Sequence, residues 1–239
     1  MSYAERSLVA DQPRPLRTHI IVRYDTERYP FAAVLQRDLF RVPRLELLHE
    51  HYIAAGRKRG LQTTLTQEDN LAVRELIQDL PDDSPFHRLY HHFVQTWLAR
   101  LVGRPMSYSG HAKMRVHFPG TGSVSGFHAD VPVTRRVDQV NLWVPFTDVE
   151  DSATLWLESD YGLADFAPVP LRYGEALIFD GGDLGHGSVP NSTSVTRISM
   201  DLRFAFKGAS SRAEGIALMN RLIEHWRLFE VNRDAAVAW

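Results

Sequence analysis

The chain has 239 residues, of which 44% are hydrophobic and 23% are charged, and this composition suits one globular domain of generous size or two small ones. The formal net charge of −2, without a dominant basic stripe, argues against nucleic acid as a partner. The chain contains no cysteine, which excludes disulfide bonds, thiolate zinc sites and cysteine nucleophiles, so a bound metal ion must use His, Asp or Glu.

The first fifteen residues, MSYAERSLVADQPRP, lack the basic start and the apolar run of a signal peptide. No stretch of 18 apolar residues follows anywhere in the sequence, so the chain has no candidate membrane span. We therefore expect a cytoplasmic protein that does not associate with membranes.

Helical periodicity dominates the chain before Gly103. The pattern predicts one strand followed by three helices, over Thr18–Tyr24, Arg44–Lys58, Thr66–Leu80 and Ser84–Gly103. Thr66 and Asp69 have the spacing of a capping box, and Ser84 followed by Pro85 is typical of a helix start.

After Gly103 the hydrophobic pattern changes to period two, with Gly and Pro at short intervals. It predicts strands over Lys113–Phe118, Gln139–Phe146, Ala153–Glu158, Glu175–Phe179 and Val195–Phe206, and a closing helix from Ser211. Short strands at this spacing indicate a sandwich or barrel. We predict a mainly β fold with flanking helices around a double-sheet core, in one domain over 1–239: a mainly helical part (1–103), a β core (104–206) and a C-terminal helix (207–239).

The strand VTRISMDLRFAF has two chemically different faces. Its apolar positions alternate with four polar ones, Arg197, Ser199, Asp201 and Arg203, which therefore share one face. One reading is a surface strand whose polar face meets water. The alternative is an enclosed polar face, and since enclosing such charges is costly unless they meet a partner, that face would then be a ligand-binding site.

Three residues have the composition of a non-haem iron site. His128 and Asp130 lie one residue apart in GFHAD, and His186 lies in GHGS, eleven residues before Arg197. A lone His-x-Asp is weak evidence and could belong to an ordinary loop, but a histidine between glycines is poorly placed for a core role. Two His and one carboxylate form the facial triad that holds Fe(II) in oxygenases.

The sequence resembles those of the Fe(II)/2-oxoglutarate-dependent oxygenases in four segments: GFHAD, NLWVPFTD, TLWLES and FDGGDLGHGSVPNSTSVTRISMDLRF. Within them it is most similar to the phytanoyl-CoA-hydroxylase-like branch and its streptomycin-biosynthesis-type members, over about Arg115 to Phe206. The resemblance implies a double-stranded β-helix core of the jelly-roll or cupin type. It also implies Fe(II) as cofactor, with 2-oxoglutarate and O2 as cosubstrates.

The same resemblance implies roles for individual residues. His128, Asp130 and His186 would be the catalytic metal ligands. Cofactor binding would fall to Arg197, which suits the distal carboxylate of 2-oxoglutarate, and to Ser188, Trp143 and Arg115.

Four further residues, Asn141, His117, Asp201 and Arg203, are candidates for binding the substrate. We expect a small polar metabolite, such as an amino acid, an aminocyclitol, an amino sugar or a nucleoside. The alternatives are that Asp201 and Arg203 pair with each other to brace the barrel, and that His117 has a hydrogen-bonded core role.

Asp130 also bears on the type of reaction. Related halogenases have a small residue at this position, where chloride binds the iron, so the resemblance implies hydroxylation, desaturation or ring closure instead of chlorination. A cupin-like metal isomerase and a non-catalytic binding barrel are the competing classes.

Other motifs are weaker. GTGSVSG has neither the spacing nor the following helix of a dinucleotide-binding loop. His49, His51, His91 and His92 lie on predicted helices and are interpreted as structural or surface residues. Asp180 and Asp183, in DGGD, are interpreted as turn residues.

Overall fold

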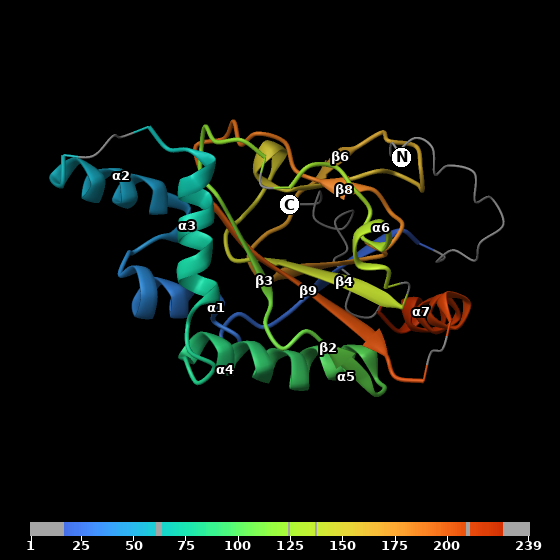
Figure 1. Cartoon of the computed structure of the whole chain (residues 1–239). Coiled ribbons are helices and arrows are strands. Elements are labelled where there is room, and N and C mark those ends of the chain that lie inside the picture. Colours follow the sequence, from blue (N-terminus) through green and yellow to red (C-terminus); the bar gives the residue numbers. More distant parts are fainter. Residues whose placement is uncertain (1–16, 61–63, 124, 137, 209–210, 227–239) are drawn as a thin grey trace, which may run out of the picture.

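Two antiparallel sheets face each other, and helices cover the outer face of the larger one (Figure 1). The structure is a computed structural model that describes residues 17–60, 64–123, 125–136, 138–208 and 211–226. Buried apolar side chains between the two sheets include Trp143, Leu157, Val169, Leu177 and Phe179. A larger core lies between the larger sheet and the helices. The predicted double-sheet core with flanking helices is confirmed.

Neighbouring strands are antiparallel in both sheets. The larger sheet has the order β1 (His19–Arg23), β7 (Glu175–Phe179), β4 (Gln139–Pro145) and β9 (Arg197–Phe206), and the other edge of β9 pairs with β2 (Met106–Tyr108) and β3 (Lys113–His117). The smaller sheet has the order β6 (Ala167–Val169), β5 (Leu155–Leu157), β8 (His186–Gly187). Every predicted strand is present, with ends shifted by at most two residues. The pattern missed β2, β6 and β8, because two or three residues carry too little alternation to detect.

The alternation along β9 decides which face meets the helices. Its apolar side chains are buried in the larger core, together with those of β3 and β4: Ile198, Met200, Leu202, Phe204, Met114, Val116, Val140, Leu142 and Val144. Burying each such side chain contributes about 1.5–3 kcal/mol. The polar positions of β9 consequently face the smaller sheet, so the reading of an enclosed polar face is correct.

The described helical segments are α1 (Phe31–Val34), the π-helical η2 (Leu35–Phe40), the 3-10 turn η3 (Leu45–Leu47), α2 (Leu48–Lys58), α3 (Gln67–Gln78), α4 (Pro85–His92), the π-helical η4 (Phe93–Leu98), α5 (Ala99–Val102), α6 (Val131–Thr134), the 3-10 turn η5 (Asp151–Ala153) and α7 (Arg212–Trp226). The sequence pattern missed the segment 31–40 and placed α2 four residues too early, since its first turn is 3-10. None of the helices in the described ranges combines the length and apolar character that crossing a bilayer requires.

The helix starts predicted at Thr66 and Ser84 are present as the sequence indicates. The backbone N–H of Thr66 donates to Asp69 at 2.8 Å, and that of His87 donates to the Ser84 hydroxyl at 3.2 Å. Gly103, with φ of +65°, ends the continuous run from α4 to α5 in the left-handed conformation that glycine adopts without strain.

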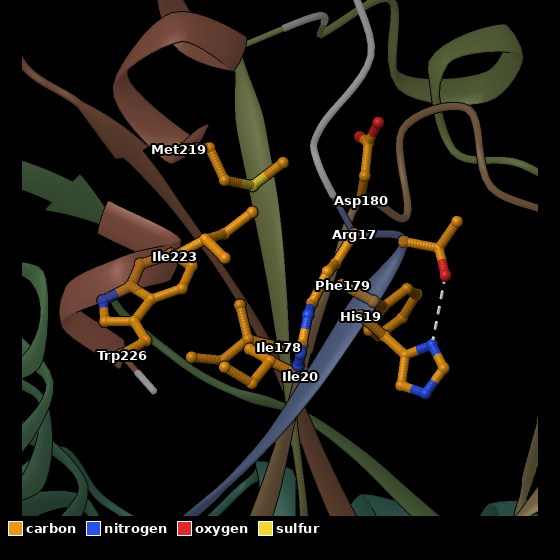
Figure 2. Close-up of a pocket in the computed structure, with 10 residues that line it drawn as sticks. Arg17, His19, Ile20, Ile178, Phe179, Asp180, Met219, Ile223 and Trp226 are labelled. Carbon is orange, nitrogen blue, oxygen red and sulfur yellow. Dashed lines mark hydrogen bonds between the residues drawn. The ribbon is translucent and has the colours of Figure 1, made fainter. Parts of the chain in front are cut away.

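The C-terminal helix α7 packs against the larger sheet, where it contacts β9 and lines a crevice with β1 and β7. Figure 2 shows its side chains Met219, Ile223 and Trp226 on one side of a small crevice, opposite Ile20 and Ile178. The Trp226 indole N–H also donates to the backbone carbonyl of Leu101 at 2.9 Å, which joins α7 to the end of α5. The part of the predicted helix beyond residue 226 lies outside the described residues.

Candidate metal centre

The backbones of His128 and His186 pair directly, although the two residues are 58 positions apart. Each N–H donates to the other residue's carbonyl at 2.9 Å, so the loop carrying His128 extends the smaller sheet beside β8. The two imidazole rings lie 4.5 Å apart between centroids. Antiparallel pairing thus brings both predicted histidine ligands to the same place.

Asp130 completes the cluster. Its Oδ1 lies 3.6 Å from His128 Nε2, and one ligand atom from each of His128, Asp130 and His186 lies within 4.8 Å of the other two. Asp130 and His186 are buried, whereas His128 is partly exposed. The residues that the sequence assigned to the metal are therefore gathered at one point between the sheets.

Backbone carbonyls fix the tautomer of both histidines. His128 Nδ1 lies 2.7 Å from the carbonyl oxygen of Gly126, and His186 Nδ1 lies 3.0 Å from that of Leu184. Because a carbonyl only accepts, each Nδ1 carries a proton in these contacts, so Nε2 is the nitrogen of each ring that can bind a metal. The contact with Asp130 raises the pKa of His128, and a bound metal would take the place of the proton on its Nε2. Burial lowers the pKa of His186 to about 4, so this ring is neutral near pH 7.

Asp130 is held as an anion by two donors on the inner face of the larger sheet. Asn141 Nδ2 donates to Oδ2 at 2.9 Å, and Arg203 Nη2 donates to Oδ1 at 2.6 Å. Burial alone would raise the pKa of Asp130, but the contacts with His128, His186, Asn141 and Arg203 outweigh it and lower the pKa to about 2. A carboxylate that stays charged suits a divalent metal ion.

The DGGD turn supports Asp130 from the other side. The backbone N–H of Asp130 donates to the Gly181 carbonyl, and that of Val131 to the Gly182 carbonyl, both at 2.9 Å. A Cβ at Gly181 would lie 2.5 Å from the Asn141 side chain. The turn therefore needs glycine at residue 181, because any larger side chain there would collide with the Asn141 amide that binds Asp130.

Glu158 supports His186 in a similar way and was missed by the sequence analysis. It is 1% exposed, and its carboxylate accepts hydrogen bonds from the backbone N–H of Gly185 at 2.6 Å and of Ala164 at 3.1 Å. A glutamate ending a short predicted strand gives no sign of this role. Its contacts fix the backbone directly before His186.

Arg197 is a buried cation that pairs with no carboxylate in the part of the chain that the structure describes. Arg197 is 2% exposed. Its Nη1 donates to the backbone carbonyls of Ala153 at 3.4 Å and Thr154 at 3.2 Å, and its Nε has no hydrogen-bond partner among the described residues. Burial lowers the pKa of Arg197 to about 9. Its guanidinium carbon lies 6.0 Å from the centre of the Trp143 ring. Leaving a guanidinium so poorly compensated is costly, and the carboxylate of a bound ligand would relieve that cost.

A hollow that opens to solvent connects the metal cluster with Arg197, and the empty space in and at the mouth of it is about 410 Å³. It is lined by eight of the eleven predicted site residues: Arg115, His128, Trp143, His186, Ser188, Arg197, Asp201 and Arg203. Asp130, Asn141 and His117 lie outside this lining. The inner face of β9 and the two histidine loops thus enclose a polar, cation-rich space beside the cluster.

The four residues predicted to bind substrate have different surroundings in the structure. Arg203 forms its ion pair with Asp130, not with Asp201, whose buried Oδ1 has no hydrogen-bond partner in the described part of the chain. His117 is fully buried, with Nε2 3.4 Å from the Thr121 carbonyl and with Nδ1 unpartnered among the same residues. Asn141 and Arg203 contact the metal ligand, and their predicted contact with substrate stays a prediction.

No model of a known protein family matches the chain. The chain is 29% identical over 206 residues to the streptomycin biosynthesis protein StrG of Streptomyces griseus. The aligned region covers 80% of this chain and 96% of StrG. The sequence resemblance to streptomycin-biosynthesis-type proteins is thus confirmed.

Solved structures give a likeness of fold. AviO1 from Streptomyces viridochromogenes Tue57 aligns with a TM-score of 0.50 at 16% identity, over 82% of this chain and 93% of AviO1. CytC3, solved with Fe(II) and alpha-ketoglutarate, aligns with a TM-score of 0.46 at 15% identity, over 82% of this chain and 77% of CytC3. The alignment with AviO1 extends over most of both chains and agrees with the fold described above.

Proposed function

We propose that this protein is a non-haem Fe(II)/2-oxoglutarate-dependent oxygenase that hydroxylates, or otherwise oxidises, a C–H bond of a small polar metabolite. The observation that carries the proposal is the shared hollow. His128 and His186 lie in its lining, with Asp130 beside them, and Nε2 of each ring is the nitrogen available to a metal. The guanidinium of Arg197, which has no carboxylate partner among the described residues, lies in the same lining. The triad would bind the metal, and Arg197 would bind one carboxylate of a dicarboxylate whose other end reaches that metal.

The described residues fit both Fe(II) and 2-oxoglutarate. His128, Asp130 and His186 offer the nitrogen and oxygen donors that Fe(II) takes and leave its other coordination positions to small ligands. Arg197 would hold the distal carboxylate of 2-oxoglutarate, with the Ser188 hydroxyl in the same lining. When bound, Fe(II) and 2-oxoglutarate supply the activation of O2 that oxidises the substrate and releases succinate and CO2.

The chain itself supplies orientation and a cavity of suitable charge. Asn141 and Arg203 fix the carboxylate of Asp130, and the two carbonyl contacts fix the imidazole rings. The presence of Asp130 favours oxidation without halogenation, because the carboxylate fills the ligand position that a halogenase leaves to chloride. The relationship to StrG supports a role in secondary metabolism.

Oxygen-dependent turnover tests the proposal. Purified protein supplied with Fe(II), 2-oxoglutarate and a panel of aminocyclitols, amino sugars, amino acids and nucleosides is expected to form succinate, fastest with the true substrate class. Omitting O2, iron or 2-oxoglutarate should abolish the product. Metal-dependent conversion of a panel member without O2 or 2-oxoglutarate would instead identify a metal isomerase.

A further inference from the structure

A second group of potential metal ligands lies on the helix-covered side of the larger sheet. Asp82 precedes α4, His87 is in its first turn, and His111 is in the connection between β2 and β3. One ligand atom from each lies within 4.8 Å of the other two. Its neighbours Phe86 and Tyr90 belong to the core beneath the helices, so this group is separated from the candidate metal centre by the sheet itself.

The geometry of this group closely parallels that of the candidate metal centre. The rings of His87 and His111 lie 4.4 Å apart and are tilted by 41°, and those of His128 and His186 lie 4.5 Å apart and are tilted by 47°. In each group a carboxylate contacts one imidazole: Asp82 Oδ1 lies 2.9 Å from His111 Nε2. Both groups therefore have the composition His, His, Asp and a similar spacing.

The protonation of His87 suits a ligand. Its Nδ1 lies 3.1 Å from the carbonyl of Pro81, which leaves the lone pair on Nε2, and no described residue forms a hydrogen bond with that Nε2. Burial lowers the pKa of this residue, which is 3% exposed, so the ring is neutral at physiological pH. A buried imidazole that keeps an unused acceptor and lies beside a second imidazole has the chemistry of a metal ligand.

The other two ligands can adjust around an ion. Ligands 2.0–2.1 Å from a tetrahedral Zn²⁺ lie about 3.3 Å from one another, and the present distances, of 2.9 Å and up to 4.8 Å, bracket this value. The side chains of Asp82 and His111 are 87% and 48% exposed, so neither is locked by packing. The positive end of α4 opposes a cation, and the Asp82 carboxylate offsets this effect.

We propose that Asp82, His87 and His111 form a second metal site, for a divalent ion of the Zn²⁺ type, with water completing the coordination. Two imidazoles and one carboxylate favour such an ion over Mg²⁺ or Ca²⁺, which prefer all-oxygen ligands. The ion would join the start of α4 to the β2–β3 connection and so brace the helical layer against the sheet. This site is independent of the proposed oxygenase reaction.

Counting bound ions tests the site. After removal of metals with a chelator, equilibrium dialysis of the full chain against Zn²⁺ is expected to give two ions per chain for wild type and one for His111→Ala. Asp82→Asn should weaken the second ion at least tenfold. The matched controls are His51→Ala, an exposed histidine on α2, and Asp83→Asn, the adjacent exposed aspartate, and both should keep two ions.

Thermal unfolding in a His186→Ala background isolates this site from the candidate metal centre. Zn²⁺ is expected to raise the melting temperature of His186→Ala but not that of the double variant His186→Ala, His111→Ala, because only the former keeps a site that binds the folded state. The proposal is overturned if wild type and His111→Ala bind Zn²⁺ with the same stoichiometry and affinity. An equal Zn²⁺-induced rise in both His186→Ala proteins would overturn it as well.

Discussion

Arg203 donates to Asp130 at 2.6 Å across 73 positions of sequence, from the central strand β9 to the loop that carries two of the proposed iron ligands. The contact joins the carboxylate of Asp130 to strand β9 of the larger sheet. Asn141, on the neighbouring strand β4, binds the other carboxylate oxygen at 2.9 Å. The carboxylate of Asp130 is therefore oriented by two strands of the sheet, while the DGGD turn holds its backbone.

Replacing Arg203 should weaken metal binding without removing a ligand. Arg203→Ala is expected to raise the dissociation constant for Fe(II) or Mn²⁺ about 10- to 100-fold, the usual cost of removing a group that orients a metal ligand. The loss should grow as the pH falls, since the pKa of Asp130 rises when the cation is removed. Anaerobic calorimetry at two pH values measures both effects. Equal metal affinity for wild type and Arg203→Ala would show that the contact has no such role.

Arg197 should matter for 2-oxoglutarate and not for the metal. Arg197→Met is expected to raise the dissociation constant of 2-oxoglutarate at least about 30-fold, since truncating one partner of a buried charge pair costs about 2 kcal/mol or more. Metal affinity in the absence of 2-oxoglutarate should stay unchanged. Ser188→Ala serves as the comparison, with a smaller loss. If Arg197→Met binds 2-oxoglutarate as wild type does, the anchor has been placed on the wrong residue.

The same substitution makes a prediction about stability. Because Arg197 is buried and none of the described carboxylates pairs with it, Arg197→Met should leave the ligand-free protein as stable as wild type or stabilise it by about 1–4 kcal/mol. Urea unfolding of both proteins without ligands measures the difference. A large destabilisation would show that the guanidinium supports the fold and is not held ready for a ligand.

The metal-free protein should lose stability as the pH falls from about 6.5 to about 4. Burial lowers the pKa of both His186 and His117 to about 4, whereas in the unfolded chain each titrates near 6.5. Within this window the unfolded chain binds more protons, so acid favours unfolding, by roughly 3 kcal/mol per residue at the lower end. Urea midpoints at pH 7.5 and 4.5 measure the loss, and His117→Asn should reduce it. Equal urea midpoints for wild type at the two pH values would show that His186 and His117 are not buried in their neutral form.

Glu158 should affect the fold and the metal together. Glu158→Ala leaves two backbone N–H donors without their carboxylate and is expected to cost about 1–3 kcal/mol of folding stability. It should also weaken metal binding, because the loop directly before His186 loses its support. Glu150→Ala, an exposed glutamate in the same part of the chain, is the control and should alter neither quantity. Unchanged stability in Glu158→Ala would exclude the supporting role.

The sequence was most informative where local patterns determine structure. Alternation along VTRISMDLRFAF correctly assigned the two faces of β9, because a strand exposes successive side chains on opposite sides whatever it packs against. The spacing of His128, Asp130 and His186 identified residues that the fold gathers. The resemblance contributed what spacing could not, namely the expectation that Arg197 lies near them.

Contacts between distant segments could not be read from the sequence. The contact of Asp130 with Arg203 depends on how the loop folds over the sheet, and the approach of His87 to His111 depends on the β2–β3 connection reaching the start of α4. Neither leaves a periodic or spacing signal. The π-helical turns within 35–40 and 93–98 are likewise invisible to a 3.6-residue pattern.

The most direct test of the account is an anaerobic titration of the metal-free protein with Fe(II) and 2-oxoglutarate, in wild type and in His128→Ala. Wild type is expected to show a visible metal-to-ligand charge-transfer band, because the iron and the 2-oxoglutarate would be bound together, and the variant is expected to show none. Folded wild-type protein that binds iron but gives no band with 2-oxoglutarate would contradict the oxygenase assignment. The metal isomerase and the binding barrel would then become the leading explanations.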